Sequence, residues 1–136
     1  MTQYCNVPGE PKGKGRPRFS RGHAYTPQTT RDYEELIAHE YKRQCNYQFQ
    51  DDANISLKVT AHFGIPKNVS KKVRNAMLTG EIMPTKKPDA DNILKIVADA
   101  LNGIAYSDDK QIVAMRVSKW YSYDGFLEIS LSEVET

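Results

Sequence analysis

Cysteine is scarce in this sequence of 136 residues, because only Cys5 and Cys45 are present and they form no Cys-x-x-Cys motif. Small secreted domains are usually held together by several disulfides. Two widely spaced cysteines predict no disulfide framework. We therefore expect this protein to work in a reducing, cytoplasmic environment.

Long apolar segments are also missing. No hydrophobic run approaches the roughly 20 residues that a membrane-spanning helix needs, and the N-terminal residues MTQYC lack the apolar region of a signal peptide. The sequence thus predicts no membrane attachment and a cytoplasmic location.

A P-loop is excluded as well, because Gly9 and Gly13 enclose three residues where that motif has four.

A strong net charge is absent too, since 19 Lys and Arg residues face 17 Asp and Glu residues, for a net charge of +2. The total charge therefore does not imply a nucleic-acid partner. The distribution is more informative: the chain before residue 88 is biased toward positive charge, and acidic residues gather near 89–109 and at the C-terminus. Such segregation suits a polyanion held by cations around an acidic metal centre.

The hydrophobic pattern predicts one α+β domain over residues 1–136, with a mixed sheet of about four strands and helices packed mainly on one face. The expected order is β-α-β-α-α-β-β. Strands are predicted at 3–7, 54–64, 111–120 and 126–132, and helices at 26–45, 70–78 and 91–102. A hairpin turn at 121–125 is expected to join the last two strands. The strand from 111 alternates poorly at first, which indicates either a bulge or burial of both faces.

Residues 8–23 are rich in proline, glycine and basic side chains, and they predict a loop. Four cations alternate along it and would line one edge of an extended chain: Lys12, Lys14, Arg16 and Arg18. The segment is either a solvated flexible loop or a contact to a nucleic-acid backbone. Clustering of the cations on a Gly/Pro frame favours the nucleic-acid contact.

The most informative stretch is KKPDADNILKIVADALN, residues 86–102. Two lysines and a proline precede a helix that should begin near Asp91, a good N-cap residue. Asp89 lies two residues earlier in extended chain, where both carboxylates point the same way and repel unless a proton or cation joins them. Mg²⁺ prefers such oxygen ligands. The alternative is an N-cap together with a carboxylate that the helix dipole favours.

Two further features bear on this helix. Asp108 and Asp109 follow it in a turn, and one of them would supply a third carboxylate if the turn folds back toward Asp89 and Asp91. Lys95 lies one helical turn after Asp91, where its ammonium would stabilise charge on a phosphate. The alternative for Lys95 is an ion pair with Asp91 or Asp99, and Asp99 is interpreted as such a partner of Lys95 and not as a metal ligand.

These residues resemble the RusA family of Holliday junction resolvases. The resemblance covers most of the chain and depends on four segments: GKGRPR (13–18), KKPDADNILK (86–95), DALN (99–102) and YSDDKQIV (106–113). It implies a homodimeric, Mg²⁺-dependent endonuclease, with Mn²⁺ as the alternative ion, that cuts four-way DNA junctions symmetrically in recombination and repair.

By the same resemblance, Asp89, Asp91 and Asp109 take the metal-binding positions and Lys95 takes the position of the catalytic lysine. Asp108 is the neighbour that would substitute in the metal shell. DNA contact is assigned to six cations: Lys12, Lys14, Arg16, Arg18, Lys86 and Lys87. Two other functions remain open. One is a metal-dependent nuclease for other branched or duplex DNA, and the other is a non-catalytic nucleic-acid-binding module.

Overall fold

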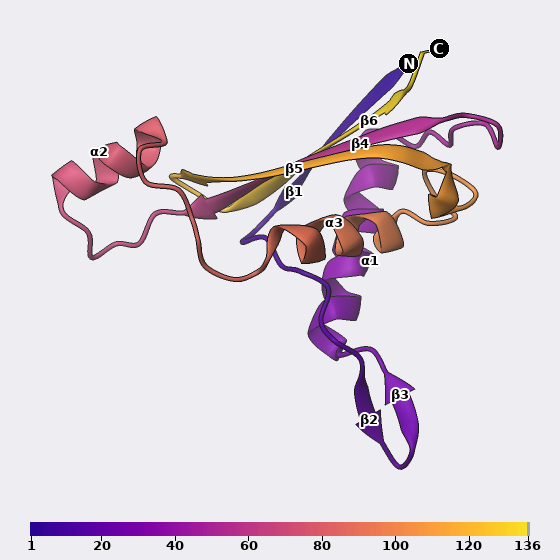
Figure 1. The fold of residues 1–136 in the computed structure, drawn as a ribbon, viewed down its shortest axis with the longest axis horizontal. Helices are drawn as coiled ribbons and strands as arrows, with labels where there is room; N and C mark the ends of the chain where they lie inside the picture. The colour runs from indigo at the N-terminus through magenta and orange to yellow at the C-terminus, as the bar shows by residue number, and fades with distance from the viewer. Residues whose placement is uncertain (136) are drawn as a thin grey trace.

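The computed structural model describes residues 1–135 and has a four-stranded mixed sheet at its centre (Figure 1). Its strand order is β1 (Thr2–Pro8), β6 (Phe126–Glu133), β4 (Ile55–Gly64) and β5 (Ile112–Ser122). Strands β4 and β5 are parallel, and the other neighbouring strands are antiparallel. This confirms the predicted α+β class and mixed sheet.

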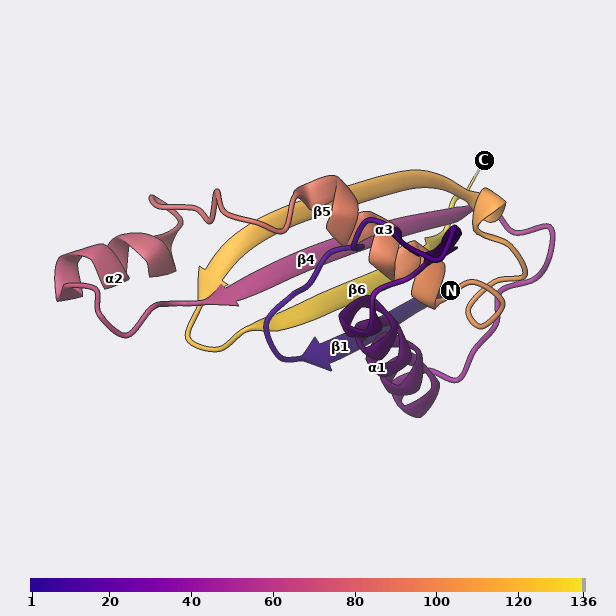
Figure 2. The same cartoon turned by 90° about the horizontal axis from the view of Figure 1, so that it is seen from below.

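Two helices, α1 (Gln28–Gln44) and α3 (Ala90–Ala100), cover one face of the sheet (Figure 2). The alternate residues of β4 from Ile55 to Phe63 are buried toward these helices, because every second side chain of a strand points to the same face. Helix α3 places Ile93, Ile96 and Val97 in the same core. The buried faces of β4 and α3 are those that the sequence pattern predicts.

Strand β5 contains the irregularity that its poor alternation suggested. The register changes between Ile55 and Ser56 of β4, which pair with Ile112 and Ala114 of β5. Val113 is therefore the extra residue of a bulge, and its side chain is 58 % exposed. Beyond the bulge, β5 continues as an edge strand beside β4.

The prediction of a hairpin between the last two strands is wrong. Strands β5 and β6 are not neighbours, since β4 lies between them and pairs with both. The turn after β5 therefore crosses the end of β4 before the chain returns as β6. The turn sequence indicates that the chain reverses direction. It does not indicate whether another strand lies between the strand before the turn and the strand after it.

A second difference is a short ribbon within the segment that the sequence predicts to be a loop. β2 (Arg18–Ser20) and β3 (His23–Tyr25) pair as an antiparallel two-stranded hairpin. Its turn residues Arg21 and Gly22 have φ values of 51° and 79°. Two successive positive φ angles are typical of the type I′ turn, whose twist matches that of a hairpin.

Helix α2 (Lys71–Thr79) extends past the end of the sheet, at the left of Figure 1. Ser70 caps it as predicted, since its hydroxyl accepts a hydrogen bond from the Val73 backbone N–H. Gly80 ends it in the left-handed conformation at φ 86°. Within residues 1–135, no helix has the length and apolar character required to span a membrane.

Candidate active site at helix α3

The N-cap of helix α3 lies two residues earlier than the Asp91 that the sequence predicts. Its N-cap is Asp89, so Asp91 lies in the first turn, where the helix dipole favours a negative charge. The Asp89 side chain forms no capping hydrogen bond, although aspartate usually caps through its carboxylate. Within residues 1–135, the Asp91 carboxylate accepts a hydrogen bond only from the adjacent Asn92 backbone N–H, at 3.0 Å.

Both carboxylates are thus free for an external partner. Asp89 and Asp91 are exposed, and neither forms a salt bridge within the described residues 1–135. Two exposed carboxylates at one helix end match the oxygen-rich, partly hydrated environment in which proteins bind Mg²⁺. The chemistry of these donors therefore fits a hard divalent cation.

The ion pair expected between Lys95 and Asp99 is not formed. Asp99 instead accepts from the Lys14 ammonium at 3.2 Å, and Lys14 also contacts Glu34 of α1 at 3.1 Å. Lys95 is exposed and has no salt bridge in the part of the chain that the structure describes. Because Lys14 neutralises Asp99, the Lys95 ammonium remains available to a phosphate.

The turn that carries Asp109 is fixed to the C-terminal end of α3. The Asp109 backbone N–H donates to Asn102 Oδ1 at 3.1 Å. The buried side chain of Gln111 donates to the carbonyl of Gln50 at 2.9 Å and to that of Ala53 at 3.3 Å. These bonds join the turn to α3 and to the loop before β4.

Asn102 and Gln111 are the positioning residues that sequence reasoning overlooked. Both occur inside the segments DALN and YSDDKQIV, but the spacing of those segments does not indicate which hydrogen bonds the two side chains form. A buried amide is informative, because its donors and acceptor must all find partners. Gln111 finds them in two backbone segments, the turn at Ser107 and the loop that contains Gln50 and Ala53.

Asp108 and Asp109 have different surroundings. Asp108 Oδ1 accepts from the Lys110 backbone N–H at 2.9 Å and caps the short 3₁₀ helix η1 (Asp109–Gln111). This hydrogen bond is the main reason that the Asp108 pKa is below its usual value. The Asp109 pKa is raised, first by partial burial and then by Asp108 and Asp99, while Lys95 opposes the shift.

The three carboxylates predicted to share one ion do not converge within this chain. Among residues 1–135, no group of three or more His, Cys, Asp or Glu side chains is close enough to hold a metal. Asp89 and Asp91 lie at the start of α3, whereas Asp109 is tied to Asn102 beyond its end. The eight steps along α3 from Asp91 to Asp99 alone span about 12 Å of helix.

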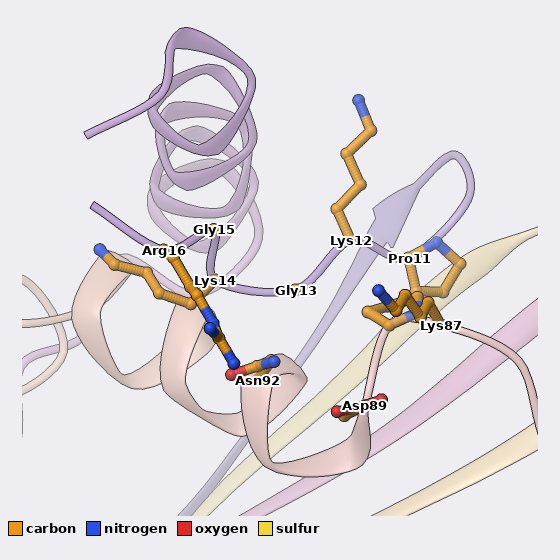
Figure 3. Close-up of a pocket in the computed structure, with 10 residues that line it drawn as sticks. Pro11, Lys12, Gly13, Lys14, Gly15, Arg16, Lys87, Asp89 and Asn92 are labelled. Carbon is orange, nitrogen blue, oxygen red and sulfur yellow. The ribbon is translucent and has the colours of Figure 1, made fainter. Parts of the chain in front are cut away.

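Residues 11–16, here called the strap, cross the first turn of α3 (Figure 3). The Lys14 backbone N–H donates to the Asn92 carbonyl at 2.9 Å. A Cβ atom at Gly13 would lie 2.8 Å from Pro88 Cβ and 2.9 Å from Asn92 Cβ, so only glycine fits this crossing. Between the strap and residues 87–89 is an open cleft of about 750 Å³, and Asp89 lies on its wall.

The six cations assigned to DNA contact differ in their availability. Lys14 is held between Glu34 and Asp99, as described above. Lys12 extends away from α3 in Figure 3, with its ammonium 5.9 Å from the centre of the Tyr33 ring. Lys86 lies 5.5 Å from the Phe63 ring centre. The remaining three are exposed at or near the cleft and in β2: Arg16, Arg18 and Lys87.

Residues 8–132 match the sequence model of the family described as Endodeoxyribonuclease RusA. The chain belongs to the RusA family. It is also 36 % identical over 137 residues to a Bacillus subtilis (strain 168) protein named "Uncharacterized protein YqaN", and the match covers 94 % of each chain. RusA membership confirms the resemblance and indicates a DNA endonuclease.

The RusA match, over residues 8–132, extends over the whole candidate site. It includes the strap, α3 with Asp89, Asp91 and Lys95, and the turn that contains Asp109. In this RusA chain, the exposed Asp89 carboxylate lines a cleft bordered by cations, Asp91 follows it in the first turn of α3, and Lys95 lies one helical turn after Asp91. This arrangement suits an anionic, phosphate-containing substrate.

Proposed function

We propose that this protein is a divalent-metal-dependent endonuclease that resolves four-way (Holliday) DNA junctions by paired, symmetric phosphodiester cleavage in recombination and repair. The observation that supports the proposal is the pair of exposed carboxylates Asp89 and Asp91 at the start of α3, of which Asp89 lines a cation-bordered cleft. Lys95, which forms no salt bridge within residues 1–135, lies one helical turn after Asp91. RusA family membership supports the nuclease part of the proposal.

Asp89 and Asp91 are the residues that would hold the ion, Mg²⁺ or alternatively Mn²⁺. Mg²⁺ usually binds through one or two carboxylates together with water and substrate phosphate oxygens, so a protein cage of three carboxylates is not required. When bound, such an ion neutralises phosphoryl charge and lowers the pKa of water. The two aspartates fix this chemistry at the start of α3.

Lys95 provides electrostatic stabilisation from the chain itself. Its ammonium is exposed on the same polar stripe of α3 as Asp91, four residues away. Cleavage of a phosphodiester places additional negative charge on the phosphoryl oxygens, and a preorganised cation lowers the energy of that state. Lys95 therefore acts on the phosphate and needs no proton transfer for this role.

Asp109 remains a proposed site residue, with Asp108 as its neighbour. Asp99 raises the pKa of the Asp109 carboxyl and Lys95 lowers it. We infer that Asp109 influences the position of the Lys95 ammonium at the phosphate. Sharing an ion with Asp89 and Asp91 would require the turn at 107–111 to approach the start of α3 in the DNA complex. The variant Asp109→Asn distinguishes a role as metal ligand from an effect on Lys95. If Asp109 is a ligand, the variant should need a different concentration of divalent metal for cutting.

A homodimer explains paired cleavage. A four-way junction has approximate twofold symmetry, and a dimer with C2 symmetry presents the same site twice. One chain carries one Asp89–Asp91 pair. Two chains would then cut two equivalent strands of the branched DNA.

The decisive experiment compares cleavage of a synthetic four-way junction and a linear duplex of the same sequence, with and without Mg²⁺. We expect Mg²⁺-dependent cutting of the junction, at least 100-fold slower cutting by Asp91→Asn, and unchanged junction binding. Asp124→Asn, which alters an exposed aspartate in the turn before β6, is the matched control and should cut normally.

Two results would redirect the proposal. Equal cutting of junction and duplex would indicate a nuclease without junction preference. Salt-sensitive DNA binding without cutting in any divalent ion would indicate a non-catalytic nucleic-acid-binding module. Normal cutting by Asp91→Asn would refute the assigned site.

A further inference from the structure

The β2–β3 ribbon projects from the N-terminal end of α1, away from the sheet (Figure 1). Every residue from 16 to 25 is exposed. A two-stranded hairpin is at best marginally stable when neither of its faces is packed. Burial of apolar surface within this chain therefore gives no reason for the ribbon.

The composition of the ribbon suits a polyanion. No acidic residue occurs between Glu10 and Asp32, and this interval contains six Lys or Arg residues. Arg18 and Arg21 belong to the ribbon, and Phe19 beside them is 77 % exposed. Positive charge combined with an exposed aromatic ring is typical of protein surfaces that bind nucleic acid.

The turn carries a second signal. Arg21 occupies the first central position of a type I′ turn at φ 51°, where asparagine, aspartate or glycine is strongly preferred. A long side chain in this left-handed conformation disfavours the turn. Its presence places a guanidinium at the tip of the ribbon, which is the position that reaches furthest from the domain.

The base of the ribbon is firmly attached near the carboxylates. The strap is bonded to α3 through Lys14, and the Gly15 backbone N–H donates to the Thr30 hydroxyl of α1 at 3.2 Å. Arg16 lines the cleft that contains Asp89, two residues before β2 begins. The ribbon therefore continues the charged surface of the site.

We propose that the β2–β3 ribbon inserts into the major groove of the duplex arm next to the cleaved strand, with Arg21 at its leading end. Three residues per strand give a ribbon about 10 Å long, similar to the roughly 8.5 Å depth of the major groove, which admits a two-stranded ribbon. Arg18 contacts the flanking phosphates. This inference deepens the proposed function and depends on it.

Arg21→Asn is the most informative variant, because Asn-Gly is a preferred type I′ turn and the substitution removes only the guanidinium. Junction affinity is measured in EDTA, where no strand is cut. On a junction with arms of about two helical turns, we expect about tenfold weaker binding. On a junction with arms shortened to about half a turn, about 5 base pairs, the variant and parent should bind equally.

Arg116→Asn is the matched control, since it removes one exposed positive charge from β5 on the sheet face opposite the helices. We expect it to weaken binding less than twofold on both junctions. The thermal midpoint of Arg21→Asn should equal or exceed that of the parent, which separates lost contact from lost folding. Arg18→Gln should lower the salt slope of log K by about one.

Three results would overturn the ribbon proposal: equal binding by Arg21→Asn and parent on long arms, an equal loss for Arg116→Asn, or an equal loss on short arms. Failure of the proposed nuclease function appears differently, as no cutting by the parent protein in Mg²⁺. A parent that cuts while Arg21→Asn binds normally refutes only the ribbon proposal. A parent that fails to bind any junction refutes both.

Discussion

At the scale of single residues, Lys14 shows how location changes the meaning of a charge. In the sequence it is one of four alternating cations in a basic segment. In the structure its ammonium bridges Glu34 and Asp99, and its side chain is only 19 % exposed. Lys14 therefore joins α1 to α3 and holds the strap, whereas Arg16 in the same segment stays exposed.

We predict that Lys14→Met destabilises the protein by about 1–2 kcal/mol, because it leaves Glu34 and Asp99 partly buried without their cation. Urea unfolding provides the measurement. Arg16→Met is the control and should unfold at nearly the parent urea concentration. An unchanged midpoint for Lys14→Met would show that the bridge contributes no stability.

The same bridge predicts a pH dependence. Burial is the largest single influence on the Lys14 pKa and lowers it, but hydrogen bonds and charge from Glu34 and Asp99 outweigh it, so the pKa is raised above 10.5. A cation with a raised folded-state pKa stabilises fully below its unfolded value and loses that contribution as the pH rises through the folded value. The stability difference between parent and Lys14→Met should therefore shrink above about pH 10.5. A difference that stays constant to pH 12 would contradict this assignment.

At the scale of elements, the strap and α3 form one unit, because backbone of one lies directly against backbone of the other. Gly13→Ala would place a methyl group 2.8 Å from Pro88 Cβ. We predict destabilisation of about 1–3 kcal/mol and slower junction cutting, since the start of α3 carries Asp89 and Asp91. Lys12→Ala, at the adjacent exposed position, should change stability little. A Gly13→Ala protein with parental stability and cutting would show that the strap moves aside easily.

The elements also show what the sequence can and cannot predict. The predictions of helix α3 and strand β4 are correct because each depends on a local alternation of apolar and polar residues. The prediction of a β5–β6 hairpin is wrong because both strands pair with β4, which is distant from them in sequence. The β2–β3 ribbon had one usable signal, the turn glycine Gly22 between short runs with aromatic residues.

The candidate site is likewise predictable from the sequence in one part and not in another. The Asp-x-Asp motif and Lys95 lie on one helix, so their spacing in sequence determines their spacing in space. The position of Asp109 depends on Asn102, Gln111 and the loop before β4, which no periodic pattern reports. Convergence of distant carboxylates is a tertiary property, and no such group forms among residues 1–135 of one chain.

At the scale of the whole molecule, one chain has one Asp89–Asp91 pair, so under the proposed function a single copy would cut one strand at a time. Paired cutting requires a second copy that holds the other strand during the same encounter. The number of active sites in the assembly is thus open to direct test with mixed dimers.

We predict that dimers with one parent chain and one Asp91→Asn chain nick a junction without resolving it. Such dimers would bind normally, because the substitution removes a carboxylate and no cation. A supercoiled plasmid with an extruded cruciform reports the outcome: parent dimers give linear DNA from two paired cuts, and mixed dimers should give nicked circles. Homodimers of Asp91→Asn, as the control, should leave the plasmid supercoiled. Linear product from purified mixed dimers, at the parental rate, would mean that one site makes both cuts and that paired cleavage does not depend on two copies of α3.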